Sequence, residues 1–255
     1  DKYFQEVEDK LVEETNYDLE ISQSKEIAKS CAHIPNLLFP EYYEDYSSDR
    51  IITMDFMKGE HLSVFTKHNN DKKKSNQLGQ ALWDFYMFQI HILKKVHADP
   101  HPGNFLINED AQLIALDFGC MKSIPNNFYM PYFELSNVKI INNPVIFKEK
   151  LYELEILTPN DTKEELGFFT EMFHELLSVF TLPFHDEIFD FSNPEFFNKI
   201  GKLSERYGKS TELRKFNANR GSKHFIYINR TFFGLYSLMF DLKATSIKIN
   251  QFKNY

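Results

Sequence analysis

The order of apolar and polar residues predicts both helices and strands in the first part of the chain. Residues 3–30 are predicted to form a helix, because apolar side chains recur on one stripe at helical spacing: Phe4, Val7, Leu11, Ile21 and Ala28. Short apolar runs at residues 37–39 and 50–55 predict two strands on either side of an acidic turn. A second stripe predicts a long helix over residues 75–95, with its buried face formed by Leu78, Leu82, Phe85, Phe88 and Ile92.

Beyond residue 100 the same pattern predicts one hairpin followed only by helices. Apolar runs at residues 105–107 and 113–116 predict the hairpin, with its turn at 108–112. Helical spacing then predicts five helices, over residues 131–140, 143–154, 163–180, 193–207 and 225–243. The expected fold class is therefore α+β, with most of the helix in the C-terminal half.

Composition and charge limit the classes of partner that the protein is expected to bind. The 255 residues are 42% hydrophobic and 16% aromatic, which is enough for a substantial core. The net charge of −8 argues against nucleic acid or an anionic lipid surface as the main partner. The two cysteines form no metal or redox pattern, and no apolar run reaches the roughly 18 residues of a spanning helix. Without a recognisable signal peptide, a reducing, cytoplasmic location is expected.

The most informative stretch runs from His97 to Asn104, HADPHPGN, and is followed by LDFG at residues 116–119. Asp99 and Asn104 are five residues apart, and Asp117 lies eighteen beyond Asp99. Protein kinases use this arrangement, with the first Asp as base and the Asn and second Asp on magnesium. Magnesium prefers such hard oxygen ligands. The spacing predicts an Mg²⁺–ATP site in which Asp99 orients or deprotonates the attacking hydroxyl or water, while Asn104 and Asp117 hold the metal.

Single Asp and Asn residues are usually caps or turn residues, so the prediction depends on their joint spacing. His97 is expected to brace the loop rather than act as a base. His101, between two prolines, has two open interpretations: a phosphate or substrate contact, or a structural role. Cys120 is expected to be a packing residue, because nothing in the sequence indicates a lowered thiol pKa.

Residues 51–59, IITMDFMKG, read as a central strand entering a hinge between two lobes. A kinase binds adenine through hinge backbone groups, so side-chain identity matters little there. The expected contacts are the carbonyl of Asp55 and the amide of Met57.

HADPHPGN with a following DFG resembles the UbiB/ADCK (ABC-one) family of atypical kinase-like proteins, in particular its C-terminal portion. The Arg of the usual His-Arg-Asp is absent, and Pro-His-Pro-Gly fills the loop. The resemblance covers most of the chain and is strongest over residues 50–124. It implies a protein-kinase-like fold, ATP and Mg²⁺ as cofactors, and a link to isoprenoid-quinone biosynthesis or lipid homeostasis.

Residues 14–20, ETNYDLE, resemble the family's E-x-D-Y-x-x-E pattern, with Asn16 in place of its Asp. By this resemblance Glu20 would pair with a strand lysine near ATP, and Glu14 would face a K-x-G-Q element. Neither that lysine, a glycine-rich phosphate loop nor K-x-G-Q is recognisable. We therefore expect residues 1–57 to be a partial N-lobe starting at the kinase αC helix, and 58–255 to be a helical C-lobe. Weak nucleotide binding and negligible turnover are expected of this chain in isolation.

Three functions remain open at this stage. The first is an ATP-dependent kinase or ATPase of the UbiB-like type, acting on an unidentified lipid or small-molecule acceptor, either free in the cytoplasm or peripheral to a membrane. The second is a small-molecule phosphotransferase similar to aminoglycoside or choline kinases, which also use an H-x-D…N pattern. The third is a non-catalytic, nucleotide-dependent scaffold. Protein phosphorylation is poorly supported for the resembled family, and an acidic chain favours no nucleic-acid role.

Overall fold

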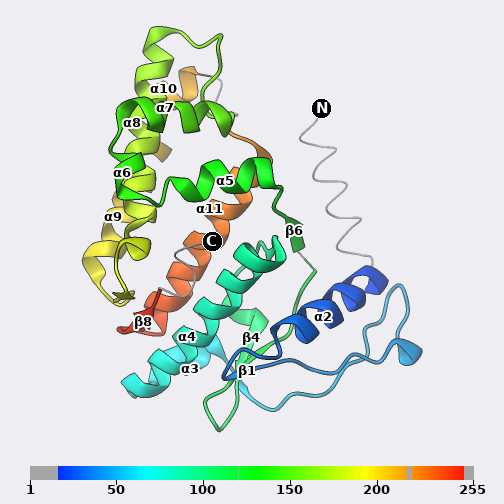
Figure 1. Ribbon diagram of the computed structural model, residues 1–255. Helices are drawn as coiled ribbons and strands as arrows, with labels where there is room; N and C mark the ends of the chain where they lie inside the picture. The colour runs from blue at the N-terminus through cyan, green and yellow to red at the C-terminus, as the bar shows by residue number, and fades with distance from the viewer. Residues whose placement is uncertain (1–16, 120, 217–219, 250–255) are drawn as a thin grey trace. The chain divides into compact units, whose positions relative to one another are not determined.

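The computed structural model describes residues 17–119, 121–216 and 220–249 of the chain (Figure 1). Two compact units divide it, Asp1–Ser123 (unit 1) and Ile124–Tyr255 (unit 2). The boundary expected between residues 57 and 58 is the predicted boundary between two kinase lobes. It differs in kind from the division into compact units, and it stays a prediction.

The long helix α4 organises unit 1. It covers Lys72–Phe88 and begins at Asp71, whose carboxylate accepts the backbone N–H groups of Lys73 (2.8 Å) and Lys74 (3.3 Å). The helix continues into a π-helical turn and ends at Lys94, which has a left-handed backbone (φ 52°). The helix predicted over 75–95 is thus confirmed in its main part. The other helical segments of this unit are α2 (Tyr17–Cys31), α3 (Leu62–His68), η1 (Glu44–Tyr46), η2, the π-helical turn (Gln89–Leu93), and η3 (Pro102–Asn104).

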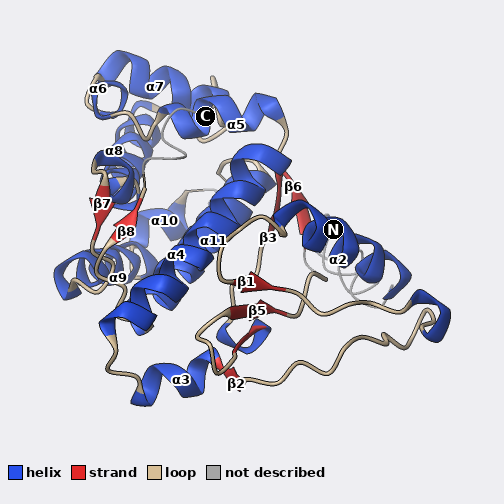
Figure 2. Cartoon of the chain, turned by 60° about the horizontal axis from the view of Figure 1, so that its bottom comes forward, coloured by secondary structure: helices blue, strands red, loops and turns tan. Residues whose placement is uncertain are grey.

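A small sheet lies beside α4 (Figure 2) and contains the predicted hairpin. Its strand order is β1-β5-β4-β2, with β1 at Leu37–Leu38, β2 at Glu60–His61, β4 at Phe105–Ile107 and β5 at Leu113–Ala115. The hairpin β4–β5 is antiparallel and pairs Phe105 with Ala115, whereas β1 runs parallel to β5. A second antiparallel ribbon joins β3 (Lys95–His97) to β6 (Met121–Ser123).

The prediction of a strand over residues 50–55 was wrong. This segment is extended but forms only isolated bridges, Tyr42 with Met54 and Ser48 with Ile51. Its apolar side chains are largely outside the core, since Ile51 is 61% exposed and Phe56 is 91% exposed. A run of apolar residues becomes a strand only where a partner strand and a buried face are available, and among the described residues this segment has neither.

The core of unit 1 gathers around Phe118. Its ring meets Phe39 at 5.9 Å, Phe85 at 6.2 Å and His97 at 6.3 Å between ring centroids. Phe85 comes from α4 and is 1% exposed, as is Phe118 itself. Packing of this ring therefore fixes the segment that carries Asp117 against α4.

Unit 2 is mostly helical. Its helix α8 has the bounds predicted, Lys163–Phe180, and starts with a capping box between Thr162 and Glu165. The remaining elements are α5 (Asn126–Glu134), α6 (Val138–Ile141), α7 (Pro144–Glu153), η4 (Leu182–His185), α9 (Pro194–Gly208), α10 (Thr211–Lys215), α11 (Lys223–Asp241) and the ribbon of β7 (Ile188–Phe189) with β8 (Ile247–Lys248). Aromatic rings fill the core, with Tyr236 of α11 within 5.5 Å of both Phe191 and Phe196.

The single helix predicted over residues 131–140 was also wrong. The structure has α5, which begins at Asn126 and contains Pro131, and then the separate short helix α6. Pro125 precedes the first turn of α5, and Pro131 lies inside this helix rather than at its start. The break before α6 follows from Asn137, whose side chain caps the new helix by accepting the N–H of Lys139 at 2.9 Å.

Candidate active site

The predicted catalytic and metal-binding residues of unit 1 lie next to the ends of two antiparallel strand pairs, β4–β5 and β3–β6. Asn104 immediately precedes β4, and Asp117 lies two residues after the end of β5. The N–H of Leu116 donates to the carbonyl of Asn104 at 3.0 Å, which holds the entrance and the exit of the hairpin together. Asp99 follows β3, and Gly119 stands just before β6, the partner of β3. Antiparallel pairing therefore brings all four residues to neighbouring strand ends.

Local hydrogen bonds orient Asn104. Its amide nitrogen donates to the backbone carbonyl of Asp99 at 3.2 Å, and its own N–H donates to the carbonyl of His101 at 3.0 Å. The amide oxygen of Asn104 is the group left to meet a cation. Asn104 thus ties the Asp99 loop to the hairpin and also offers a hard oxygen ligand.

Two carboxylates converge near Gly119. Asp117 accepts the N–H of Gly119 at 2.9 Å through Oδ1. A side-chain carbon at Gly119 would lie 3.4 Å from Oδ1 of Asp117 and 3.4 Å from Oε2 of Glu20. Burial, and next the negative charge of Asp117, raise the pKa of Glu20 from 4.5 to about 7. Glu20 has no ion pair with any residue in the described ranges, so a cation placed between the two carboxylates would relieve this cost.

The donor set suits magnesium. Mg²⁺ usually takes one or two carboxylates, together with water and the phosphates of a nucleotide, rather than a complete protein cage. Asp117 and the amide oxygen of Asn104 can supply such a partial set. Within the described residues, no cluster of three or more His, Cys, Asp or Glu side chains could enclose a metal.

His97 is placed as a structural residue. Its backbone N–H donates to Oε1 of Gln89 at 3.0 Å, and its ring packs against Phe118. Burial lowers the pKa of His97, although Asp117 and Asp99 oppose the effect. A buried imidazole with a lowered pKa stays neutral at pH 7, which agrees with a bracing role.

His101 also has a structural contact. Its Nδ1 accepts the N–H of Gly103 at 3.1 Å and caps the short helical turn Pro102–Asn104. The residue is otherwise exposed. The capping bond occupies one ring nitrogen, while a contact of the other with phosphate or substrate stays a prediction.

Two tyrosines near the site were not among the predicted functional residues. The hydroxyl of Tyr42 donates to the carbonyl of Leu116 at 3.0 Å, next to Asp117. The hydroxyl of Tyr86 is buried without a hydrogen-bond partner in the described part of the chain. Burial, then the charges of Asp99 and Asp117, raise the pKa of Tyr86. Both are tyrosines in a chain rich in aromatic residues, so the sequence offered no signal to separate them from the core.

The predicted hinge groups lie in the extended segment before β2. The N–H of Asp55 donates to the carbonyl of Glu41 at 2.9 Å, and its carboxylate accepts the hydroxyl of Tyr43 at 2.8 Å. The carbonyl of Asp55 and the amide of Met57 make no hydrogen bond to the residues described, so both are available to a ligand. No described contact joins them to Asp99, Asn104 or Asp117. Glu14 and Cys120 lie outside the described residues.

The comparisons agree on the family. The ABC1 atypical kinase-like domain matches residues 1–144, more than half of the chain. The chain belongs to the ABC1 atypical kinase-like family. The resemblance to UbiB/ADCK proteins is thereby confirmed. The matched region contains Glu20, residues 51–59, HADPHPGN and DFG.

Relatives are similar over part of their length. Protein Activity of BC1 Complex Kinase 3, chloroplastic, from Arabidopsis thaliana is 30% identical over 116 residues, which are 46% of this chain and 16% of that protein. AarF domain-containing kinase 1 of Drosophila melanogaster is 27% identical over 137 residues, or 49% of this chain and 26% of the relative. The chain therefore spans about a quarter or less of these relatives.

The fold is shared with a solved structure. Rv3197 of Mycobacterium tuberculosis, solved in complex with erythromycin, superposes with a TM-score of 0.72 and 17% identity, covering 97% of this chain and 60% of that one. This likeness supports the α+β, kinase-like fold. In the described ranges, none of the helices has the length and apolar character needed to cross a membrane.

Proposed function

We propose that this ABC1 family member binds ATP with magnesium and catalyses phosphoryl transfer or ATP hydrolysis. The observation that carries the proposal is the convergence of Asp99, Asn104 and Asp117 at neighbouring strand ends, with Glu20 beside Asp117. A phosphoryl-transfer site needs a base, metal ligands and a cation-binding carboxylate in one place, and these residues supply that set.

The roles follow from chemistry and position. Asp99 is half-buried after β3 and would accept the proton of the attacking hydroxyl or water. Asn104 and Asp117 would hold magnesium, which when bound neutralises charge on the phosphates. Glu20 would pair with a cation that contacts the nucleotide, by resemblance the strand lysine of kinases. The backbone of Asp55 and Met57 would receive adenine.

In this proposal the N-terminal segment up to residue 57 is the partial N-lobe and the rest is the C-lobe. The acceptor is a lipid or small molecule, or water in the case of an ATPase, with peripheral membrane association. On the strength of the family resemblance we extend the proposal to a role in isoprenoid-quinone biosynthesis or lipid homeostasis.

The Asp99→Asn variant tests the proposal by separating binding from chemistry. Asn keeps the size of the side chain but cannot take up a proton, so turnover should fall about 10²–10⁴-fold, the usual contribution of a general base. ATP affinity should stay within about twofold, because Asp99 is not a metal ligand here. Phosphate release and nucleotide binding are measured on the same preparations of the full-length protein, because negligible turnover is expected of the 255-residue chain in isolation. Turnover equal to that of the parent would remove Asp99 as the base, and ATP binding without any turnover in the parent would favour a scaffold.

A further inference from the structure

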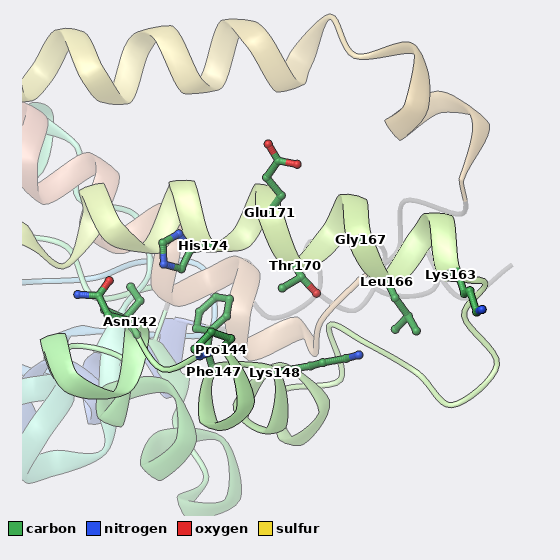
Figure 3. A pocket seen from close by; sticks show the side chains of 11 residues that line it. Asn142, Pro144, Phe147, Lys148, Lys163, Leu166, Gly167, Thr170, Glu171 and His174 are labelled. Carbon is green, nitrogen blue, oxygen red and sulfur yellow. The ribbon is translucent and has the colours of Figure 1, made fainter.

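Unit 2 contains a pocket whose lining includes none of the residues proposed for the nucleotide site, which all belong to unit 1. The pocket lies between α7 and α8 and has a volume of about 610 Å³ (Figure 3). Sites for small organic ligands typically measure roughly 300–1,000 Å³. The pocket is thus large enough for a ligand of that class.

One side of the pocket is apolar. Its lining includes Ile141, Pro144, Phe147 and Leu166. Phe147 is 1% exposed, and its ring meets His174 edge-on at 5.2 Å between centroids. Figure 3 shows Phe147 and Leu166 pointing into the space between the two helices. A ligand with an apolar body would remove this surface from water.

Two lysines add positive charge to the same space. Lys148 of α7 is half-buried and Lys163 begins α8, and both line the pocket. Neither has an ion pair or hydrogen bond with the residues that the structure describes. By contrast Lys150, on the same helix as Lys148, contacts Glu134 at 2.7 Å and Glu153 at 3.0 Å. Lys163 is exposed, and an ammonium group beside an apolar surface and without a counter-charge is a favourable place for an anion.

The acidic residue of the pocket does not neutralise these lysines. Glu171 belongs to the lining, but in Figure 3 its carboxylate points away from Phe147 and Lys148. With two lysines against one glutamate, the lining carries a net positive charge.

Gly167 keeps part of the pocket open. It lies inside the 18-residue helix α8, where glycine costs about 1 kcal/mol relative to alanine. A side-chain carbon placed there would meet nothing within 4 Å, so no close neighbour requires a glycine. Gly167 lines the pocket, and a single side-chain carbon can be added there without a clash.

We propose that this pocket binds an amphiphilic organic anion. Its apolar body would lie against Phe147 and Leu166, and its carboxylate or phosphate head would contact Lys148 and Lys163. Chemistry and charge fit such a ligand better than a neutral apolar one, because two ammonium groups would otherwise be left beside its body.

A set of matched probes tests each part of the ligand by calorimetry on the full 255-residue chain. Octanoate and octyl phosphate carry both parts, 1-octanol carries the body alone, and acetate and inorganic phosphate carry the heads alone. We expect one or both amphiphilic anions to bind at one site about tenfold more tightly than the alcohol or the free heads. Whichever of the two binds more tightly identifies the head group. No binding of either, or octanol binding equally well, would overturn the proposal.

Variants locate the binding. Lys148→Gln and Lys163→Gln should each weaken the amphiphilic anion several-fold, about threefold to tenfold, and leave octanol unchanged. Lys202→Gln, on the exposed surface of α9, is the matched control and should change nothing. Gly167→Phe should block all probes, whereas Gly167→Ala should keep binding. Anion binding that survives both lysine substitutions would contradict the proposal, even if Gly167→Phe fails to fold.

Discussion

Ionisation of Glu20 lowers the stability of the folded protein when no cation is bound nearby. Its pKa is raised from 4.5 to about 7 by burial and by Asp117. Between these two values the folded protein holds a proton that the unfolded chain releases. The stability contributed by protonated Glu20 is therefore fully present below pH 4.5 and is lost as the pH rises through about 7.

Replacing Glu20 by Gln should remove this part of the pH dependence. At pH 8, without magnesium, Glu20→Gln is expected to be more stable than the parent by about 1 kcal/mol, a value reduced for solvent screening of a half-exposed group. At pH 4.5 the two should unfold alike. Urea unfolding at both pH values measures the difference, with Asp18→Asn on the same helix as control. Equal stability at pH 8 would show that Glu20 is not destabilised by its surroundings.

Tyr86 makes a second prediction at this scale. A buried hydroxyl without a partner costs about 1–3 kcal/mol, and Tyr86 is fully buried close to Asp99 and Asp117. Tyr86→Phe should therefore raise the free energy of unfolding of the nucleotide-free protein by about 1 kcal/mol. Denaturant titration gives the value directly. A clear loss of stability would mean that the hydroxyl is hydrogen-bonded, for example to a buried water.

Among the elements, the junction between the hinge segment and β2 depends on Gly59. A side-chain carbon there would come within 2.8 Å of the carbonyl oxygen of Ile107 in β4. The neighbour is backbone and cannot turn aside, so Gly59→Ala must push β2 away from the sheet. We expect a loss of about 1–3 kcal/mol in unfolding free energy, as for other overpacked sites.

Gly201→Ala is the matched control for Gly59→Ala, because a side-chain carbon at Gly201 of α9 would meet nothing within 4 Å. It should be neutral or slightly stabilising, as expected for alanine in a helix. If Gly59→Ala were as stable as its control, the close approach of residue 59 to β4 would be contradicted.

Elements with local signals could be predicted from the sequence. The hairpin at residues 105–115 and the helix at 163–180 depend on their own residues. The hairpin has two short apolar runs around a turn, and the helix has a capping box at Thr162. The site followed for the same reason, since HADPHPGN and DFG flank that hairpin. Their proximity is a consequence of strand pairing within a short stretch.

Elements that depend on distant partners could not be predicted. Residues 50–55 look like a strand but have no partner in the described chain, and the ribbon of β3 with β6 forms from two triplets too short to recognise. The position of Glu20 beside Asp117, and of Tyr86 beside Asp99, results from packing between segments far apart in sequence. Single-sequence periodicity carries no information about such contacts.

At the scale of the whole molecule, the residues proposed for phosphoryl chemistry all lie in unit 1. The ABC1 match covers residues 1–144, which include all of that unit, and the proposed base, metal ligands and adenine contacts all belong to it. Unit 2 shares the kinase-like fold, because the similarity to Rv3197 extends over 97% of the chain. Its pocket between α7 and α8 gives it a separate binding capacity in our proposal.

The central claim is that Asp117 holds magnesium for a bound nucleotide, and ATP titration with and without Mg²⁺ tests it most directly. Asp117→Asn keeps the acceptor for the N–H of Gly119 but removes the charge, and Asp110→Asn in the hairpin turn is the control. The parent and the control should bind ATP weakly and only with Mg²⁺, and Asp117→Asn should lose about tenfold or more of that affinity. Magnesium-dependent binding of equal strength in Asp117→Asn would contradict the account.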